Sequence, residues 1–255
     1  MDTSLDNVVA DWKLISDGPA DGTSLPVRSE GVPAVLTIDA HEHAHLVLRR
    51  WNGDGAVRLL RADPHRNTIL VERFGPGLGT EDDAACAIVA TLYPRLHVPA
   101  MPQLSSLPTL LEAWSDDFTQ LPRSAPIPHR LIEQAVTLCR DLATLPADHV
   151  LHGDLHYGTV RSAGREPWLA TFPAPVNGDP AFEVAPMLWN RWDRIADAVR
   201  WGVQRRFYAL VDAAGFDEER ARSWALLRIV RAAVDSLVVG TDLTRWVTLA
   251  KALQH

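Results

Sequence analysis

The chain has 255 residues, of which 47% are hydrophobic and 22% are charged, a balance typical of a globular protein with a substantial core. Its net charge of −7 argues against nucleic acid or an anionic membrane as a partner. The cysteines, Cys86 and Cys139, lack any metal-binding spacing, which favours buried free thiols. The acidic start has no apolar signal core, and no apolar run reaches the ~18 residues of a membrane span, so we expect a cytoplasmic protein.

Strand patterns dominate the first 75 residues. The predicted elements are a strand at 33–38, a short helix at 40–51 and a strand pair at 56–60 and 68–71. A turn-forming run at 17–24 precedes them, either as a loop that covers phosphates or as an ordinary hairpin loop. Gly75-Pro-Gly77 is a candidate hinge between two lobes.

From residue 81 onward, apolar residues recur mainly at helical spacing. The predicted helices are 84–95, 107–120, 129–144, 181–195, 198–214, 217–237 and 242–254. A loop at 151–160 and a short strand pair on either side of Ala163-Gly164 interrupt them. This order predicts an α+β chain with a small strand-rich N-terminal lobe at 1–76 and a larger α-helical C-terminal lobe at 77–255.

The loop at 151–160 carries the main chemical motif, Leu-His-Gly-Asp-Leu-His-Tyr-Gly-Thr-Val. An aspartate at the position of Asp154 can accept the proton of a substrate hydroxyl, as in the catalytic loop of kinases. Five residues later that pattern requires an asparagine that holds magnesium, and this chain has Thr159. The second metal ligand is expected at Phe172, whose ring offers no oxygen to a hard cation. We therefore predict a kinase-like loop without a metal site.

Several motifs follow one another in a fixed order over nearly the whole chain. They are Trp51–Leu60, His152–His156, Arg165–Leu169, Gly178–Phe182 and Ala185–Asp193. This set resembles the aminoglycoside phosphotransferases, in the branch of streptomycin 6-kinase and hydroxyurea phosphotransferase. The resemblance implies a bilobal protein-kinase-like fold and transfer of the γ-phosphoryl group of ATP to a hydroxyl.

The chain departs from this family at the positions that handle phosphate and metal. The family's small-lobe strand ends in Val-Leu-Lys, but here it ends in Thr37, and the partner glutamate is replaced by Ala44, two residues after Glu42. The family's Ile-Asp-Pro-Lys-Pro segment becomes Thr-Phe-Pro-Ala-Pro, with Phe172 and Ala174 in place of the charged residues. Because phosphoryl transfer depends on positioning and charge neutralisation, these losses predict that ordinary ATP-dependent transfer is absent and that no cofactor is bound.

The remaining candidate residues each allow two interpretations. Asp154 is either a base or ligand anchor, or a structural residue that pins its own loop. Trp189 and Trp192 have the spacing of one helical face and either pack in the core or form an aromatic wall, with Asn190 and Asp193 as polar groups. The candidate ligand-binding residues are therefore His152, His156, Thr159, Phe172, Trp189, Asn190, Trp192 and Asp193.

Three functional hypotheses follow. The leading one is a non-phosphorylating family member that binds a small organic molecule in the interlobe cleft, because the replacements make the phosphate cavity smaller and more apolar. Asp154 would then serve in metal-independent acid–base chemistry, such as a cyclisation or rearrangement in specialised metabolism. The second is a pseudokinase that regulates or binds without catalysis. The third is an active small-molecule O-phosphotransferase that holds magnesium through Thr159 together with Asp179 or Glu183.

Overall fold

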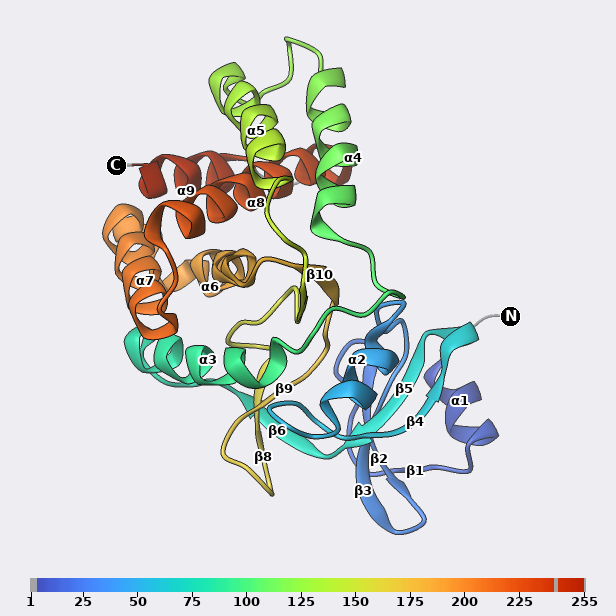
Figure 1. Ribbon diagram of the computed structural model, residues 1–255. Helices are drawn as coiled ribbons and strands as arrows, with labels where there is room; N and C mark the ends of the chain where they lie inside the picture. The colour runs from blue at the N-terminus through green and yellow to red at the C-terminus, as the bar shows by residue number, and fades with distance from the viewer. Residues whose placement is uncertain (1–3, 241–242, 255) are drawn as a thin grey trace. The chain divides into compact units, whose positions relative to one another are not determined.

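The computed structural model of the chain describes residues 4–240 and 243–254 (Figure 1). Its contacts divide the chain into two compact units. Unit 1 contains the residues up to Gly79 together with Tyr157–Pro175, and unit 2 contains Thr80–His156 together with the residues from Val176 onward. This grouping differs from the predicted division into 1–76 and 77–255, because residues 157–175 join the N-terminal part.

Unit 1 is built around an antiparallel five-stranded sheet in the order β1-β2-β3-β5-β4. Its strands are β1 (Ile15–Ser16), β2 (Ser24–Ser29), β3 (Val32–Thr37), β4 (Leu59–Asp63) and β5 (Thr68–Glu72), and its helices are α1 (Leu5–Asp11) and α2 (Ala44–Trp51). In α1, the Ser4 hydroxyl accepts the backbone N–H of Asn7, and Val8 packs with Val27 and Leu36 of the sheet. The predicted strand at 33–38 and the helix that ends at Trp51 are thus confirmed, although the helix begins at Ala44.

A second, three-stranded sheet explains why residues 157–175 belong to unit 1. In it, β8 (Val160–Ala163) pairs with both β6 (Phe74–Gly77) and β9 (Leu169–Ala170). The predicted strand at 56–60 starts later than expected, because Ala56 bridges to Ala170 of β9 instead of pairing with β5. The candidate hinge is strand β6, and a Cβ on Gly77 would lie 2.4 Å from the Tyr157 carbonyl oxygen, so only glycine allows this close approach.

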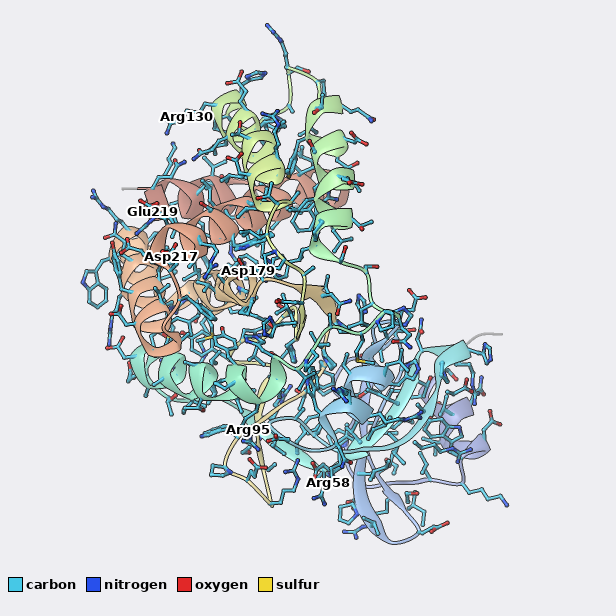
Figure 2. The ribbon with its side chains drawn as sticks, viewed as in Figure 1. Arg58, Arg95, Arg130, Asp179, Asp217 and Glu219 are labelled. Atoms are coloured by element: carbon cyan, nitrogen blue, oxygen red, sulfur yellow. The ribbon has the colours of Figure 1, made fainter. Side chains whose placement is uncertain are left out.

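Unit 2 is mainly helical. Its elements are α3 (Asp82–Leu96), α4 (Leu107–Gln120), α5 (His129–Leu142), β7 (His149–Leu151), β10 (Val176–Gly178), α6 (Ala185–Trp189), α7 (Val199–Ala214), α8 (Glu218–Val239) and α9 (Thr244–Gln254). Figure 2 labels Asp217 and Glu219 at the start of α8, where the Asp217 carboxylate accepts the backbone N–H of Arg220. The first predicted residue of the last helix, at 242, lies outside the described residues. None of the helices in the described part of the chain combines the length and apolar character that a bilayer crossing requires.

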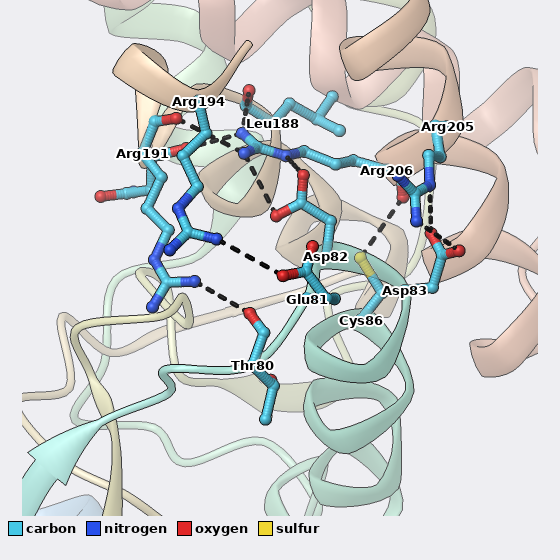
Figure 3. A network of polar contacts seen from close by, with 11 residues as sticks. Thr80, Glu81, Asp82, Asp83, Cys86, Leu188, Arg191, Arg194, Arg205 and Arg206 are labelled. Atoms are coloured by element: carbon cyan, nitrogen blue, oxygen red, sulfur yellow. Dashed lines mark hydrogen bonds and ion pairs between the residues drawn. The ribbon is translucent and has the colours of Figure 1, made fainter.

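One predicted helix, 181–195, is wrong. The segment consists of the 3₁₀ helix Pro180–Val184, then α6, then the 3₁₀ turns Trp192–Arg194 and Ala196–Ala198. The buried guanidinium of Arg206 binds the Asp82 carboxylate and also takes the carbonyl oxygens of Leu188, Asn190 and Arg191 as acceptors (Figure 3). Arg191 adopts a left-handed conformation with φ 52°, which a continuous α-helix does not contain, and α6 ends before it, at Trp189. Trp189 and Trp192 therefore lie in two separate helical segments.

Candidate functional site

In unit 2, the catalytic loop leaves the end of β7 and presents the carboxylate of Asp154. His152 is fully buried, and its Nδ1 accepts the backbone N–H of Asp154 at 3.3 Å. The Asp154 side chain is 45% exposed, and one of its oxygens lies 3.5 Å from His156 Nε2. The loop therefore combines a buried histidine that orders the backbone with a carboxylate that solvent can reach.

Two charged residues hold the backbone of this loop. Glu183 has a fully buried side chain, and its Oε1 accepts the N–H groups of His152 at 2.5 Å and Gly153 at 3.2 Å. Arg228 of α8 donates to the Gly153 carbonyl oxygen at 2.7 Å and to that of Phe182 at 3.0 Å. These hydrogen bonds hold both N–H groups and a carbonyl group of the loop backbone.

Sequence reasoning gave neither residue this role, although a signal was present. Glu183 is the only charged residue in the apolar run 180–189, and Arg228 interrupts the apolar stretch of α8. Charged side chains inside such runs are seldom buried without a partner. The two positions therefore indicated a buried polar contact before its partner was known.

The electrostatics of unit 2 favour an ionised Asp154. Burial alone would raise the pKa of Asp154, but the hydrogen bond with His156 and the nearby charges of His156 and Arg228 lower it below its usual value. Burial would also raise the pKa of Glu183, but the hydrogen bond with His97 and the charges of His152 and His97 outweigh it, so the pKa of Glu183 is lowered. Burial lowers the pKa of Arg228 to about 10, which leaves the guanidinium charged at neutral pH. Asp154 is thus suited to act as a base or as an anchor for a donor group, and not as an acid.

Four predicted ligand-binding residues lie between positions 189 and 193. Among the described contacts, Trp189 is the one that reaches the catalytic loop, through Arg228. The Arg228 guanidinium lies 5.3 Å from the centre of a Trp189 ring. Trp192 instead contacts the Arg245 guanidinium, which lies 5.4 Å from the centre of a Trp192 ring. Asn190 donates to the Pro186 carbonyl oxygen at 2.9 Å and so caps the end of α6, and Asp193 is exposed. Ligand binding by these four residues stays a prediction.

In unit 1, the position at which the family resemblance places a phosphate-binding lysine is Thr37, which carries no charge. Thr37 ends β3, is 3% exposed, and has its Oγ1 3.1 Å from Ser24 Oγ. Ala44 is the buried first residue of α2, whereas Glu42 precedes that helix and is exposed. Glu42 therefore does not replace the missing glutamate on the buried face of the helix.

The two positions at which the sequence analysis expects metal ligands also lie in unit 1, and their side chains do not fit a magnesium-bound nucleotide. Thr159 is buried, and its carbonyl oxygen accepts both the N–H and the hydroxyl of Thr171, at 2.8 and 2.9 Å. Phe172 offers no oxygen ligand, and the half-buried Ala174 supplies no charge. Across residues 4–240 and 243–254, no group of three or more His, Cys, Asp or Glu side chains is arranged to hold a metal ion.

Phe172 instead belongs to a small aromatic cluster. It has a left-handed backbone with φ 54°, a conformation that is unfavourable for a bulky side chain. Its ring meets Phe74 edge-on, with ring centres 5.4 Å apart. The Arg161 guanidinium lies 5.8 Å from the Phe172 ring centre and 5.5 Å from that of Phe74.

This cluster forms one side of a pocket of about 430 Å³ within unit 1. The pocket is lined by Asp21, Gly22, Thr23, Ser24, Pro26, Val35, Phe74, Gly75, Arg161 and Phe172. The turn-forming run at 17–24 thus contributes directly to its wall. A volume of this size falls within the range of small-molecule sites, and the mixture of apolar walls with a few polar groups is typical of them.

Comparison with known proteins identifies the family. Residues 12–240 match the model of the aminoglycoside/hydroxyurea antibiotic resistance kinases. The chain belongs to this family. It is 38% identical to streptomycin 6-kinase of Streptomyces glaucescens, over 95% of this chain and 86% of the relative. It is 35% identical to hydroxyurea phosphotransferase of Kitasatospora aureofaciens, over 86% of this chain and 68% of the relative.

A solved structure supports the predicted fold. The choline kinase LicA from Streptococcus pneumoniae matches with a TM-score of 0.65, at 9% identity, over 98% of this chain and 96% of that one. At this identity the match concerns the fold alone. The sheet of unit 1 and the helices of unit 2 are thus the mixed α and β structure of a protein-kinase-like fold, as predicted from the sequence.

Proposed function

We propose that the chain is a divergent member of this kinase family that has lost ATP-dependent phosphotransfer and binds a small organic molecule in the pocket of unit 1. The observation that carries the proposal is Phe172. At the position where the family places a metal-binding aspartate, an aromatic ring is held in an unfavourable backbone conformation and forms a wall of that pocket.

The rate effect of a metal ion, compared with that of a general base, supports the proposed loss of phosphotransfer. A metal ion supplies several kcal/mol of transition-state stabilisation, and each ~1.4 kcal/mol changes a rate about tenfold. General-base assistance by a residue such as Asp154 contributes only about 10²- to 10⁴-fold. Asp154 alone therefore does not compensate for the absent metal ligand at Phe172 and the absent cation at Thr37.

The carboxylates that could replace the metal ligands are already engaged. Asp179, labelled in Figure 2, accepts the N–H of Ala181 at 3.0 Å and the indole N–H of Trp224 at 2.9 Å. Glu183 binds the backbone of the catalytic loop. Recruiting Asp179 for magnesium would disturb two buried hydrogen bonds. Glu183 keeps an oxygen, Oε2, without a hydrogen-bond partner among the described residues, but its side chain is fully buried. Both observations disfavour the hypothesis of an active kinase with unusual ligands.

The ionised Asp154 supports a second candidate function, metal-independent base catalysis. A base at this position would remove a proton from a bound substrate, as the first step of a cyclisation or rearrangement. The competing hypothesis is a pseudokinase that binds its ligand without turnover. Asp154→Asn separates the two: it abolishes turnover if Asp154 is the base, whereas a pseudokinase has no turnover for the substitution to remove.

The primary experiment is thermal denaturation of the purified protein with ATP and magnesium, ATP alone and magnesium alone. A ligand that binds only the folded state raises the melting temperature. We expect no magnesium-dependent shift with millimolar ATP. The streptomycin 6-kinase of S. glaucescens, assayed in parallel, serves as the positive control. A magnesium-dependent shift in this chain would overturn the loss of metal-dependent nucleotide binding.

A restored variant tests whether the replacements are the cause. The triple substitution Thr37→Lys, Thr159→Asn and Phe172→Asp returns the family's residues to the three positions. We expect this variant to gain a magnesium-dependent shift with ATP while the unsubstituted chain shows none. A folded triple variant that still shows no shift would mean that these three positions do not explain the loss.

A further inference from the structure

Arg161 differs from the other half-buried arginines of unit 1. Arg66 pairs with Asp63 at 2.7 Å, Arg73 with Asp17 at 2.6 Å and Arg165 with Glu72 at 2.9 Å. Within the part of the chain that the structure describes, no carboxylate pairs with Arg161. Its Nε donates to the Gly158 carbonyl oxygen at 2.6 Å, which uses one of its five N–H groups.

The position of this guanidinium is a chemical reason to expect a ligand. Arg161 lines the pocket beside Phe74 and Phe172, and the two rings offset only part of its charge through cation–π contact. A half-buried charge without a counter-charge is unfavourable, and a planar guanidinium with free N–H groups matches the two oxygens of a carboxylate. The ligand itself can supply the counter-charge of Arg161.

We infer that the pocket of unit 1 takes a small organic acid with an aromatic or apolar body, whose carboxylate binds Arg161. This inference rests on the proposed function and names the chemical class of its ligand. The body of the acid contacts Phe74, Phe172 and Val35, and Thr23 is a further lining residue, one that carries a hydroxyl. A volume of about 430 Å³ accommodates a single-ring acid.

Asp21 also lines the pocket, and its negative charge disfavours an anion there. Asp21 lies in the exposed loop before β2, where its backbone exchanges two hydrogen bonds with Ser24. Replacing its side chain by an amide keeps the shape of the loop and removes the repulsion. The two charged residues of the pocket therefore predict opposite effects on binding of the same acid.

The test compares phenylacetate with phenylacetamide, which share a ring and differ in charge, by calorimetric titration and thermal shift. We expect the acid to bind and the amide to bind roughly tenfold more weakly or not at all. Arg161→Gln should weaken phenylacetate binding by about tenfold or more, while Asp21→Asn keeps or strengthens it. Arg61→Gln is the matched control, since Arg61 also stacks on an aromatic ring of unit 1, Trp12 at 4.4 Å, but does not line the pocket.

Each outcome bears on one claim. Equal binding of acid and amide, full binding in Arg161→Gln, or no binding of the acid at millimolar concentration overturns the organic-acid ligand. Binding of both compounds that is lost in Phe172→Ala would refute the charge requirement and still support an organic-molecule pocket. The proposed loss of phosphotransfer fails separately, through a magnesium-dependent shift with ATP.

Discussion

The catalytic loop 152–156 in unit 2 and the segment 159–174 in unit 1 follow each other along the chain but differ in what their side chains bind. In the loop, Asp154 is retained, and Glu183 and Arg228 satisfy the backbone around it. In the later segment, Thr159 and Phe172 stand where metal ligands were expected. The Phe172 ring contacts Phe74 and the guanidinium of Arg161, which has no carboxylate partner among residues 4–240 and 243–254.

This difference separates what folding requires from what the chemistry requires. The contacts of Glu183 and Arg228 fix buried backbone groups, so losing them would destabilise unit 2 whatever the protein binds. Metal and phosphate ligands do not support the fold in this way, and they can change while the fold persists. The proposed function therefore requires no change in the contacts that order the catalytic loop.

Removal of the buried Glu183 carboxylate has the largest expected effect. In Glu183→Ala, the N–H groups of His152 and Gly153 lose their buried acceptor. We expect the free energy of unfolding to fall by about 3 kcal/mol or more, since each unsatisfied buried group costs roughly 1–3 kcal/mol. Urea denaturation measures this change.

Glu183→Gln provides the control, because an amide oxygen still accepts from the same N–H groups. Its loss should be less than that of Glu183→Ala by about 1 kcal/mol or more. Equal losses for the two variants would show that the carboxylate does not hold the loop through these hydrogen bonds.

In unit 1, the predicted change in stability concerns the backbone conformation of Phe172. Both Phe172→Ala and Phe172→Gly remove the contact with Phe74, but only glycine adopts a φ of 54° without steric cost. We expect Phe172→Gly to be more stable than Phe172→Ala by about 1 kcal/mol. Urea denaturation of the pair decides this, and a more stable alanine variant would contradict the conformation assigned to Phe172.

A smaller effect is expected from the hydroxyl pair that occupies the phosphate-lysine position. Thr37→Val and Ser24→Ala each remove one partner of a part-buried hydrogen bond of 3.1 Å. A double-mutant cycle should give a coupling free energy of about 1 kcal/mol or less. Additive losses would show that Thr37 contributes by packing and not through Ser24.

The sequence allowed much of the fold to be predicted, because amphipathic periodicity marks helices such as α4 and α5 directly. It failed at 181–195, where Arg191 has a left-handed backbone and the buried Arg206 binds backbone carbonyl oxygens of the segment. That contact joins residues far apart in the chain, and no local pattern indicates it.

The candidate site shows the same limit. The motif spacing located Asp154, Thr159 and Phe172, because the family fixes their register. The spacing did not indicate Arg161, since its significance depends on a pocket built from β2, β3 and β6 together with its own strand. The position of a residue in a motif was therefore readable from the sequence, whereas its place in a pocket built by tertiary contacts was not.

The smallest expected effect is the contribution of Asp154 to acid sensitivity. Its pKa is lower in the folded chain than in the unfolded one, so its stabilising contribution is complete above the unfolded value of about 3.9 and is lost as the pH falls through the folded value. The difference in unfolding free energy between the unsubstituted chain and Asp154→Asn should therefore decrease as the pH is lowered from about 5 to about 3. Because the side chain is 45% exposed, solvent screens the charges and keeps the effect small.

His156 supplies the internal test of this assignment. It is the hydrogen-bond partner that lowers the pKa of Asp154, so the pH dependence of the Asp154→Asn difference should shrink when it is measured in a His156→Gln background. Denaturation of the four proteins over this pH range provides the measurement. If the difference keeps its full pH dependence without His156, other groups maintain the ionised carboxylate, and Arg228, whose charge also lowers the pKa of Asp154, is the next residue to substitute.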